Sequence, residues 1–180
     1  MHRYHRRFGG IGTIVTLCDG RAFTAAHCLA AVDGRPGTVI EAVGRRFVVV
    51  RRWSPFGTDL AVLRALTGNG RGELATRTFL RPGVDVTFWG HTGRRFQRRQ
   101  ATIVAVTATT ATARVHHARG VCGNDSGGPV FAGDVLAGIA VARTGAAVSA
   151  RCSCQLVMVR TDSPSMRRRI AAAFERRPVG

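Results

Sequence analysis

The sequence contains no lysine, and all 27 of its basic side chains are arginine. Against them stand only 10 acidic residues, which gives a formal net charge of +17 at pH 7. Such a charge attracts polyanions and acidic substrates. The arginines are spread along the chain, with several pairs and one longer cluster at 167–169, and they lack the interleaved basic and aromatic spacing of a nucleic-acid reader. We therefore expect non-specific attraction to polyanions and no specific nucleic-acid binding.

Long apolar runs are also missing. No stretch approaches the roughly 20 apolar residues that a membrane-spanning helix needs, so no membrane span is expected. Residues 1–10 carry basic side chains with no apolar run after them, so they are not predicted to be a signal peptide. The chain has 180 residues and is 45% hydrophobic, which suits one domain with a buried core. We expect this domain to be a monomer.

Short apolar, β-branched runs alternate along the chain with glycine, proline, aspartate or asparagine. About ten to twelve such runs, with few helical stretches, predict an all-β sandwich or barrel. The turn-rich segment 67–72 separates two groups of runs, roughly 11–70 and 73–162. The predicted strands include Thr13–Leu17, Thr38–Val43, Arg46–Val50, Leu60–Leu63, Asp85–Trp89, Ala101–Val106, Ala111–Val115, Pro129–Phe131, Val135–Val141 and Leu156–Val159.

A single helix is predicted at the C-terminal end, over 163–175. Ser163 or Ser165 can cap it, and Pro164 suits its first turn. Its apolar stripe is formed by Ile170, Ala173 and Phe174.

A serine lies in the glycine-rich segment Gly123–Pro129, which reads GNDSGGP. On a tight turn, flanking glycines can hold the Ser126 hydroxyl exposed while backbone N–H groups converge beside it. Acyl transfer needs such an arrangement, because negative charge develops on the carbonyl oxygen in the transition state. The alternative is an ordinary glycine-rich hairpin turn.

Two further segments carry residues that suit the same chemistry. In TAAHC, His27 follows an apolar run and precedes Cys28, and a histidine so placed can act as a general base near pH 7. In TDLAVL, Asp59 precedes a buried apolar strand, where a carboxylate costs free energy unless it has a partner. Each residue could instead be structural, His27 within the core and Asp59 in a turn at the start of a strand.

Taken in chain order, these three segments resemble the motifs of the trypsin/chymotrypsin family of serine proteases, which are TAAHC, DIALL-like and GDSGGP. The first motif is identical, the second has conservative exchanges, and the third has one change. The resemblance covers nearly the whole chain, and its compact spacing is most similar to the short bacterial members, the streptogrisin and alpha-lytic group. It implies two six-stranded antiparallel β-barrels with a C-terminal helix, in one peptidase domain spanning 1–180.

The resemblance implies a serine endopeptidase that works through an acyl-enzyme on polypeptide substrates, without cofactor or metal. Ser126 would be the nucleophile, His27 would take and return its proton, and Asp59 would orient His27. The N–H groups of Asn124 and Ser126 would form the oxyanion hole. Asp125 would be a buried acid, paired with a freed N-terminus or an arginine. Because an Arg-Ile-Val-Gly-Gly junction is absent from the sequence, an arginine is expected.

Five cysteines are present, and none forms a CxxC pair, which argues against a structural zinc site. Their number fits two disulfides and one thiol, which favours an oxidising, extracellular compartment. The resemblance implies one disulfide between Cys18 and Cys28 and a second from Cys122 to Cys152 or Cys154. Cys152 is preferred because it leaves more loop before the next strand. The alternative is that all five are buried thiols.

One departure from the family concerns Asn124, which stands where the family has glycine. The amide there must face the oxyanion in a backbone conformation that glycine adopts easily and asparagine adopts at some cost. An oxyanion donor is worth about 3 kcal/mol. The alternative function is therefore a catalytically impaired binding module with a protease fold, which would hold polyanions or acidic partners.

A second departure concerns the primary specificity pocket. Val141, Ala142 and Arg143 replace the usual Ser-Trp-Gly or Ser-Gly-Gly, so the serine that normally bonds the triad carboxylate is missing. Gly120, with Val121 after it, stands where trypsin-like enzymes have an acid at the pocket floor, so a preference for Arg or Lys is not expected. With Arg143 at the entrance, small, apolar or acidic side chains remain possible. Arg143 could instead simply point to solvent.

Overall fold

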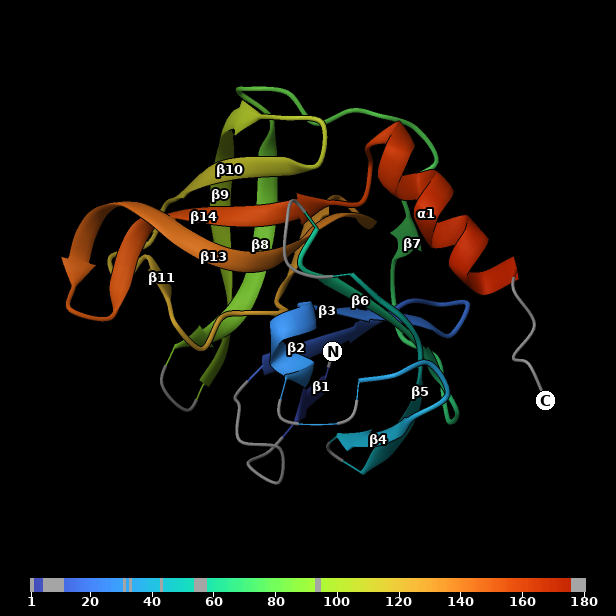
Figure 1. Ribbon diagram of the computed structural model, residues 1–180. Coiled ribbons are helices and arrows are strands. Elements are labelled where there is room, and N and C mark those ends of the chain that lie inside the picture. Colours follow the sequence, from blue (N-terminus) through green and yellow to red (C-terminus); the bar gives the residue numbers. More distant parts are fainter. Residues whose placement is uncertain are drawn as a thin grey trace.

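The computed structural model is built mainly from β-strands, which form two sheets with an α-helix beside them (Figure 1). It describes residues 2–4, 12–30, 32, 34–42, 44–53, 58–92 and 95–175. The first sheet contains β1–β6 and the second contains β7–β14. In those described ranges, no helix is long and apolar enough to cross a membrane.

The first sheet has six antiparallel strands in the order β1-β2-β3-β6-β5-β4. Its edge strands, β1 and β4, contact each other, so the sheet curls into a barrel. Its interior is filled by buried apolar side chains such as Ile14, Phe47 and Leu63. The strands are β1 (His2–Tyr4), β2 (Gly12–Thr16), β3 (Arg21–Thr24), β4 (Val39–Ala42), β5 (Arg45–Trp53) and β6 (Leu60–Ala65).

The second sheet has the order β11-β14-β10-β9-β8-β12-β13-β7, and an additional pairing joins β13 to β14. That pairing closes a ring of six strands, and the two-residue strands β7 and β11 add to its sides. The strands are β7 (Glu73–Leu74), β8 (Asp85–Thr92), β9 (Arg95–Val106), β10 (Thr110–Val115), β11 (Val121–Cys122), β12 (Pro129–Ala132), β13 (Val135–Ser149) and β14 (Cys152–Arg160).

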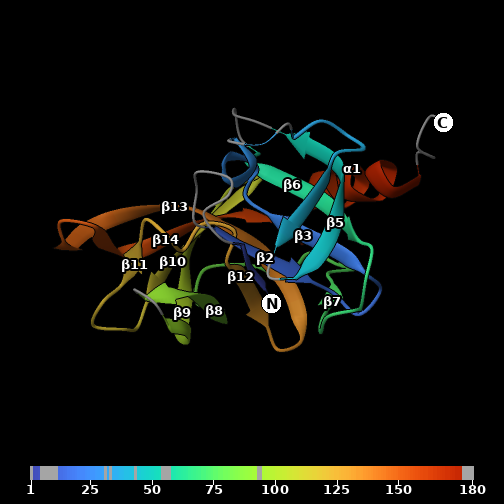
Figure 2. The same cartoon turned by 90° about the horizontal axis from the view of Figure 1, so that it is seen from below.

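An apolar cluster between the barrels also holds the C-terminal helix α1 (Pro164–Glu175) in place. Phe23 comes from the first barrel, Ile139 from the second and Ile170 from the helix, and all three are fully buried. On the side of the molecule away from α1, the hairpin of β13 and β14 extends beyond the barrel (Figures 1 and 2).

Hydrogen bonds around a buried carboxylate fix the start of α1. The Ser163 hydroxyl oxygen accepts a first-turn N–H of the helix at 3.3 Å, as an N-cap does. Asp162, with 0% exposure, accepts hydrogen bonds from the Arg160 side chain at 2.8 and 3.0 Å. It also accepts the N–H groups of Phe79 and Leu80, each at 2.9 Å. This carboxylate therefore ties the end of β14 to the segment that enters β8.

The structure confirms the predicted all-β fold of two barrels with a C-terminal helix. It adds β1, β3, β7 and β11 to the predicted strands, starts β9 at Arg95 and extends β13 to Ser149. Residues 142–149 of β13 are all exposed. A strand without a buried face has no apolar alternation, so its length is not visible in the sequence.

Replacing Asp162 with asparagine should lower the free energy of unfolding by about 3 kcal/mol, because it leaves the buried Arg160 guanidinium without its counter-charge. Urea unfolding at pH 7 measures this. The matched control is Asp134→Asn, on an exposed turn, which should change stability by less than about 0.5 kcal/mol. Equal stabilities of the two variants would contradict the structural role of Asp162.

Candidate active site

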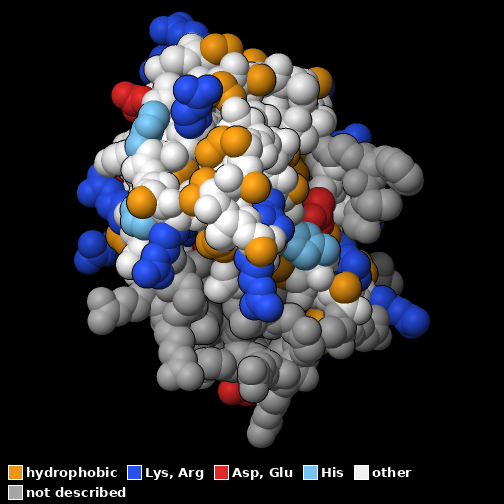
Figure 3. Space-filling model, turned by 90° about the vertical axis from the view of Figure 1, so that its left-hand side faces the viewer, with side chains coloured by type: hydrophobic (Ala, Val, Ile, Leu, Met, Phe, Trp, Pro, Cys, Tyr) orange, Lys and Arg blue, Asp and Glu red, His pale blue; other side chains and the backbone are white. Residues whose placement is uncertain are grey.

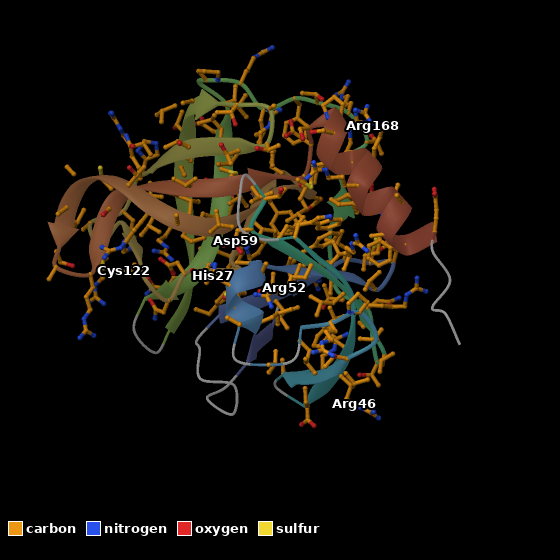
Figure 4. All side chains as sticks on the ribbon, in the orientation of Figure 1. His27, Arg46, Arg52, Asp59, Cys122 and Arg168 are labelled. Atoms are coloured by element: carbon orange, nitrogen blue, oxygen red, sulfur yellow. A yellow bond between two sulfur atoms is a disulfide. The ribbon has the colours of Figure 1, made fainter. Side chains whose placement is uncertain are left out.

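His27 and Asp59 lie side by side near the junction of the two barrels (Figure 4). His27 belongs to a 3₁₀ helix, η2 (Ala26–Leu29), just after β3, and Asp59 immediately precedes β6. Because β3 and β6 pair antiparallel, the end of one lies beside the start of the other. Asp59 Oδ1 accepts the backbone N–H of His27 at 2.8 Å, and Oδ2 is hydrogen-bonded to His27 Nδ1. The other ring nitrogen, Nε2, is therefore the one that can act on a reacting group.

The pairing shifts the pKa values of both groups. The hydrogen bond to Asp59, aided by the neighbouring Cys28 and opposed by burial, raises the pKa of His27 to about 10. Burial favours a higher pKa for Asp59, but hydrogen bonds from His27 and from the backbone outweigh it and lower that pKa. The contact with the Asp59 carboxylate therefore stabilises the protonated form of His27, which is the form that arises when His27 accepts a proton.

Ser126 lies on the loop between β11 and β12 and is partly exposed. Its carbonyl accepts the N–H of Thr13, in β2, at 3.0 Å, so this loop of the second barrel is docked on the first. Gly127 makes the approach possible. It has φ +78°, and a Cβ there would lie 2.2 Å from the Thr13 carbonyl oxygen. The glycine after Ser126 therefore brings the serine loop to the junction of the barrels.

Two backbone N–H groups of the serine loop are unused. Within the described part of the chain, the N–H groups of Asn124 and Ser126 have no hydrogen-bond acceptor. The N–H groups of Asp125 and Gly127, by contrast, donate to backbone carbonyls at 3.1 and 2.8 Å. Unused donors beside a serine are what an oxyanion hole requires.

A buried ion pair supports this loop from inside the second barrel. Arg99, on β9, donates from Nη2 to Asp125 Oδ1 at 2.6 Å and from Nη1 to Oδ2 at 2.9 Å. The side-chain exposures are 0% and 1%. Arg99 also donates to the Gly120 carbonyl at 2.5 Å, and Asp125 accepts the Cys122 N–H at 2.8 Å. The guanidinium lies 4.5 Å from the centroid of the Phe88 ring, a cation–π distance. The expected arginine partner of Asp125 is thus Arg99.

A pocket of about 150 Å³ opens beside Ser126. Its walls include the segments 121–123 and 140–143. Gly120 is buried and is not among the described residues that line the pocket. Its carbonyl accepts a hydrogen bond from Arg99. Four residues predicted for substrate binding do line it: Val121, Val141, Ala142 and Arg143.

Residues 15–156 of the sequence match the family model described as Trypsin. The chain belongs to the trypsin family. A comparison with curated proteins found no significant match. The solved structures with a similar fold include active and inactivated proteases.

One such structure is the Rv3671c protease from M. tuberculosis in its active form, with 20% identity and a TM-score of 0.59, covering 99% of this chain and 81% of that one. Another is the scabies mite inactivated protease paralogue S-D1, with 14% identity and a TM-score of 0.64, covering 93% and 88%. A third is the HtrA-type protease AlgW with decapeptide, with 18% identity and a TM-score of 0.65, covering 92% and 51%. At such identities the likeness concerns the trypsin fold, not activity.

Of the two disulfides that the trypsin-family resemblance implies, the structure contains one. Cys122 is bonded to Cys152, which ties β11 to β14. The expectation of a Cys18–Cys28 bridge is wrong, since neither sulfur is in a disulfide. Cys18 lies exposed in the β2–β3 turn, whereas Cys28 is buried beyond the other end of β3. The hairpin therefore keeps the two apart. Cys154 is also a thiol.

The trypsin-family motifs did not reveal Arg99 or Gly90. Arg99 lies two and four residues before Ala101 and Ile103, which are buried, so strand alternation from these two places it on the inner face. Gly90, on β8, leaves room for the ion pair, because a Cβ there would lie 2.3 Å from atoms of both Arg99 and Asp125. Within the described ranges, no group of three or more His, Cys, Asp or Glu side chains is placed to hold a metal ion.

Replacing Arg99 with methionine should lower the free energy of unfolding by about 3–5 kcal/mol, because Asp125 is left as an uncompensated buried charge. Urea unfolding measures the change. Arg98→Met, at the exposed neighbouring position, is the matched control and should be nearly neutral. Adding Asp125→Asn to Arg99→Met should restore part of the stability, and a double variant no more stable than the single one would argue against a charge effect.

Replacing Asp59 with asparagine should change stability in a pH-dependent way. The raised pKa of His27 contributes stability that is complete below pH 6.5 and is lost as the pH rises through about 10. The lowered pKa of Asp59 contributes stability above its unfolded value of 3.8, which is lost as the pH falls through the folded value. The stability difference between wild type and Asp59→Asn should thus be largest between about pH 4 and 6.5.

Urea unfolding at a series of pH values measures that window. NMR of the imidazole C–H protons provides a second measurement, because the His27 titration should move to lower pH in Asp59→Asn. An unchanged His27 titration would show that Asp59 does not set it.

Proposed function

We propose that this chain is a serine endopeptidase in which Ser126, His27 and Asp59 form the catalytic triad of a single domain spanning 1–180. The observation that supports this most is the docking of the Ser126 loop on β2, in the barrel that carries the oriented His27–Asp59 pair. The two free N–H groups beside Ser126 supply the electrostatic part of the same machinery.

In this proposal, Ser126 Oγ attacks the carbonyl carbon of a peptide bond while His27 Nε2 takes the hydroxyl proton. Asp59 stabilises the imidazolium that forms, and the N–H groups of Asn124 and Ser126 bind the oxyanion. The intermediate collapses to an acyl-enzyme, and the leaving amine takes the proton from His27. Water then attacks the ester, with His27 again acting as base, and releases the second product.

The proposed substrate is a polypeptide whose residue before the cleaved bond is not arginine or lysine. Asp125 is the only acidic residue that lines the described pocket, and its carboxylate is occupied by Arg99. We further propose an extracellular location and a monomer, since a disulfide suits an oxidising compartment. Neither a cofactor nor a specific nucleic acid is part of the proposed activity.

Two observations favour a second candidate, a catalytically impaired binding module with the same fold. Among the described residues, the Ser126 hydroxyl makes no hydrogen bond to His27, and Asn124 occupies the oxyanion position in place of glycine. Such a module would bind polyanions or acidic partners through the net charge of +17.

A fluorophosphonate probe should label the wild-type protein at Ser126, because the probe reacts only with an activated serine. Ser126→Ala should abolish labelling, and Ser149→Ala, at an exposed serine on β13, should not change it. Mass spectrometry locates the label. A folded wild-type protein that is never labelled would overturn the proposed protease.

The same assay separates the two candidates. Asn124→Gly should speed labelling and peptide hydrolysis by about 100-fold if Asn124 holds an oxyanion donor out of place. Hydrolysis in neither wild type nor Asn124→Gly, together with polyanion binding that weakens steeply with salt, would favour the binding module.

A further inference from the structure

We infer that the pocket beside Ser126 selects an acidic side chain on the residue before the cleaved bond, with Arg143 as the group that binds its carboxylate. The inference rests on the proposed function, because it names the substrate of the same site. The structure provides three lines of support, which concern the cation itself, the other pocket walls and the size of the pocket.

Arg143 is a cation without a partner in the protein. It lines the same pocket as Ser126 and is exposed. Within the described residues, its guanidinium takes part in no ion pair or hydrogen bond. Its backbone is held in register opposite Leu156 of β14, which also lines the pocket. Arg143 is thus a lining residue with unused donors, and a planar guanidinium suits the two oxygens of a carboxylate.

The other residues that line the pocket do not compete for this role. Asp125 carries the only other ionisable side chain among them, and its carboxylate is 1% exposed and paired with Arg99. Ala140, Val141 and Ala142 also line the pocket, and their apolar side chains bring no competing charge. A substrate lysine or arginine side chain would be repelled by Arg143, and the described pocket offers it no free carboxylate. A glutamate side chain would meet its counter-charge.

The volume of the pocket admits an acid but does not by itself select one. A cavity of 150 Å³ accepts a benzene molecule, so glutamate, glutamine, leucine and phenylalanine side chains all come within its size. Charge must therefore separate these candidates. Glutamate and glutamine have the same shape, so comparing them isolates the contribution of Arg143.

The net positive charge of the whole molecule also favours acidic substrates, but it does not determine which substrate residue binds in the pocket. The face shown in Figure 3 carries many more blue arginine side chains than red carboxylates, in keeping with the net charge of +17. This field attracts any acidic substrate. Only a charged group in the pocket, such as Arg143, can select for a negative charge at one particular residue of the substrate.

The test compares peptides that are identical except for Glu, Gln, Leu or Lys before the cleaved bond. We expect kcat/KM for Glu to exceed that for Gln by about 10- to 100-fold, as for a charge-assisted hydrogen bond. Arg143→Ala should bring the ratio near 1, and Arg143→Glu should favour Lys. Arg168→Glu makes the same charge change on α1, far from His27 and Cys122 in Figure 4, and should keep the wild-type ratio.

A second measurement does not need turnover. In the Ser126→Ala variant, fluorescence anisotropy compares the binding of cleavage products that end in Glu or Gln, which differ only in their last side chain. The Glu product should bind about 10-fold or more tightly, and Arg143→Ala should remove the difference. Equal binding of the two products, or a preference that survives Arg143→Ala, overturns the inference.

The two proposals fail in different ways. A protein that reacts with the fluorophosphonate at Ser126 but treats Glu and Gln alike keeps the protease function and loses the acidic selectivity. A protein that never labels but still binds the Glu product through Arg143 keeps the selectivity of the pocket and loses the protease function.

Discussion

The geometry around Ser126 depends on the buried ion pair between Arg99 and Asp125. Removing two charges from water is costly, and here the cost is offset by two direct contacts, by the Gly120 carbonyl and Cys122 N–H, and by the face of the Phe88 ring. Since Arg99 is part of β9, the serine loop receives its anchor when the second barrel forms. The described contacts of this anchor therefore all come from the second barrel.

The candidate site is divided between the two barrels, so its geometry depends on how the barrels pack against each other. His27 and Asp59 belong to the first barrel, and Ser126 and the pocket belong to the second. A backbone hydrogen bond from Thr13 to Ser126 and an apolar cluster shared with α1 join the two halves. In the proposed protease, a change in that cluster would alter catalysis without touching a reacting group, because it would shift one half of the site against the other.

Much of this organisation could be predicted from the sequence. Alternating apolar runs indicate the β-fold. The three residues of the proposed triad, His27, Asp59 and Ser126, could be found because each lies in a short motif that resembles one of the trypsin family. Arg99 was missed because one arginine among several nearby looks like surface charge until the inner face of β9 is traced from Ala101. The Cys18–Cys28 bridge was wrongly expected because the order of cysteines along a chain does not show at which end of a hairpin each one lies.

The absence of lysine and the abundance of arginine also bear on whether the proposed protease would digest itself. A protease is exposed to its own molecules at high local concentration. If its pocket accepted arginine, each of its 27 arginines would mark a bond to attack. In the proposed protease, the guanidinium of Arg143 would repel arginine side chains, and the sequence offers only 10 acidic residues as alternatives. Asp125 and Asp162 are buried among these, and Asp59 is engaged by His27. With the proposed activity and specificity, the composition and the pocket together would limit self-digestion.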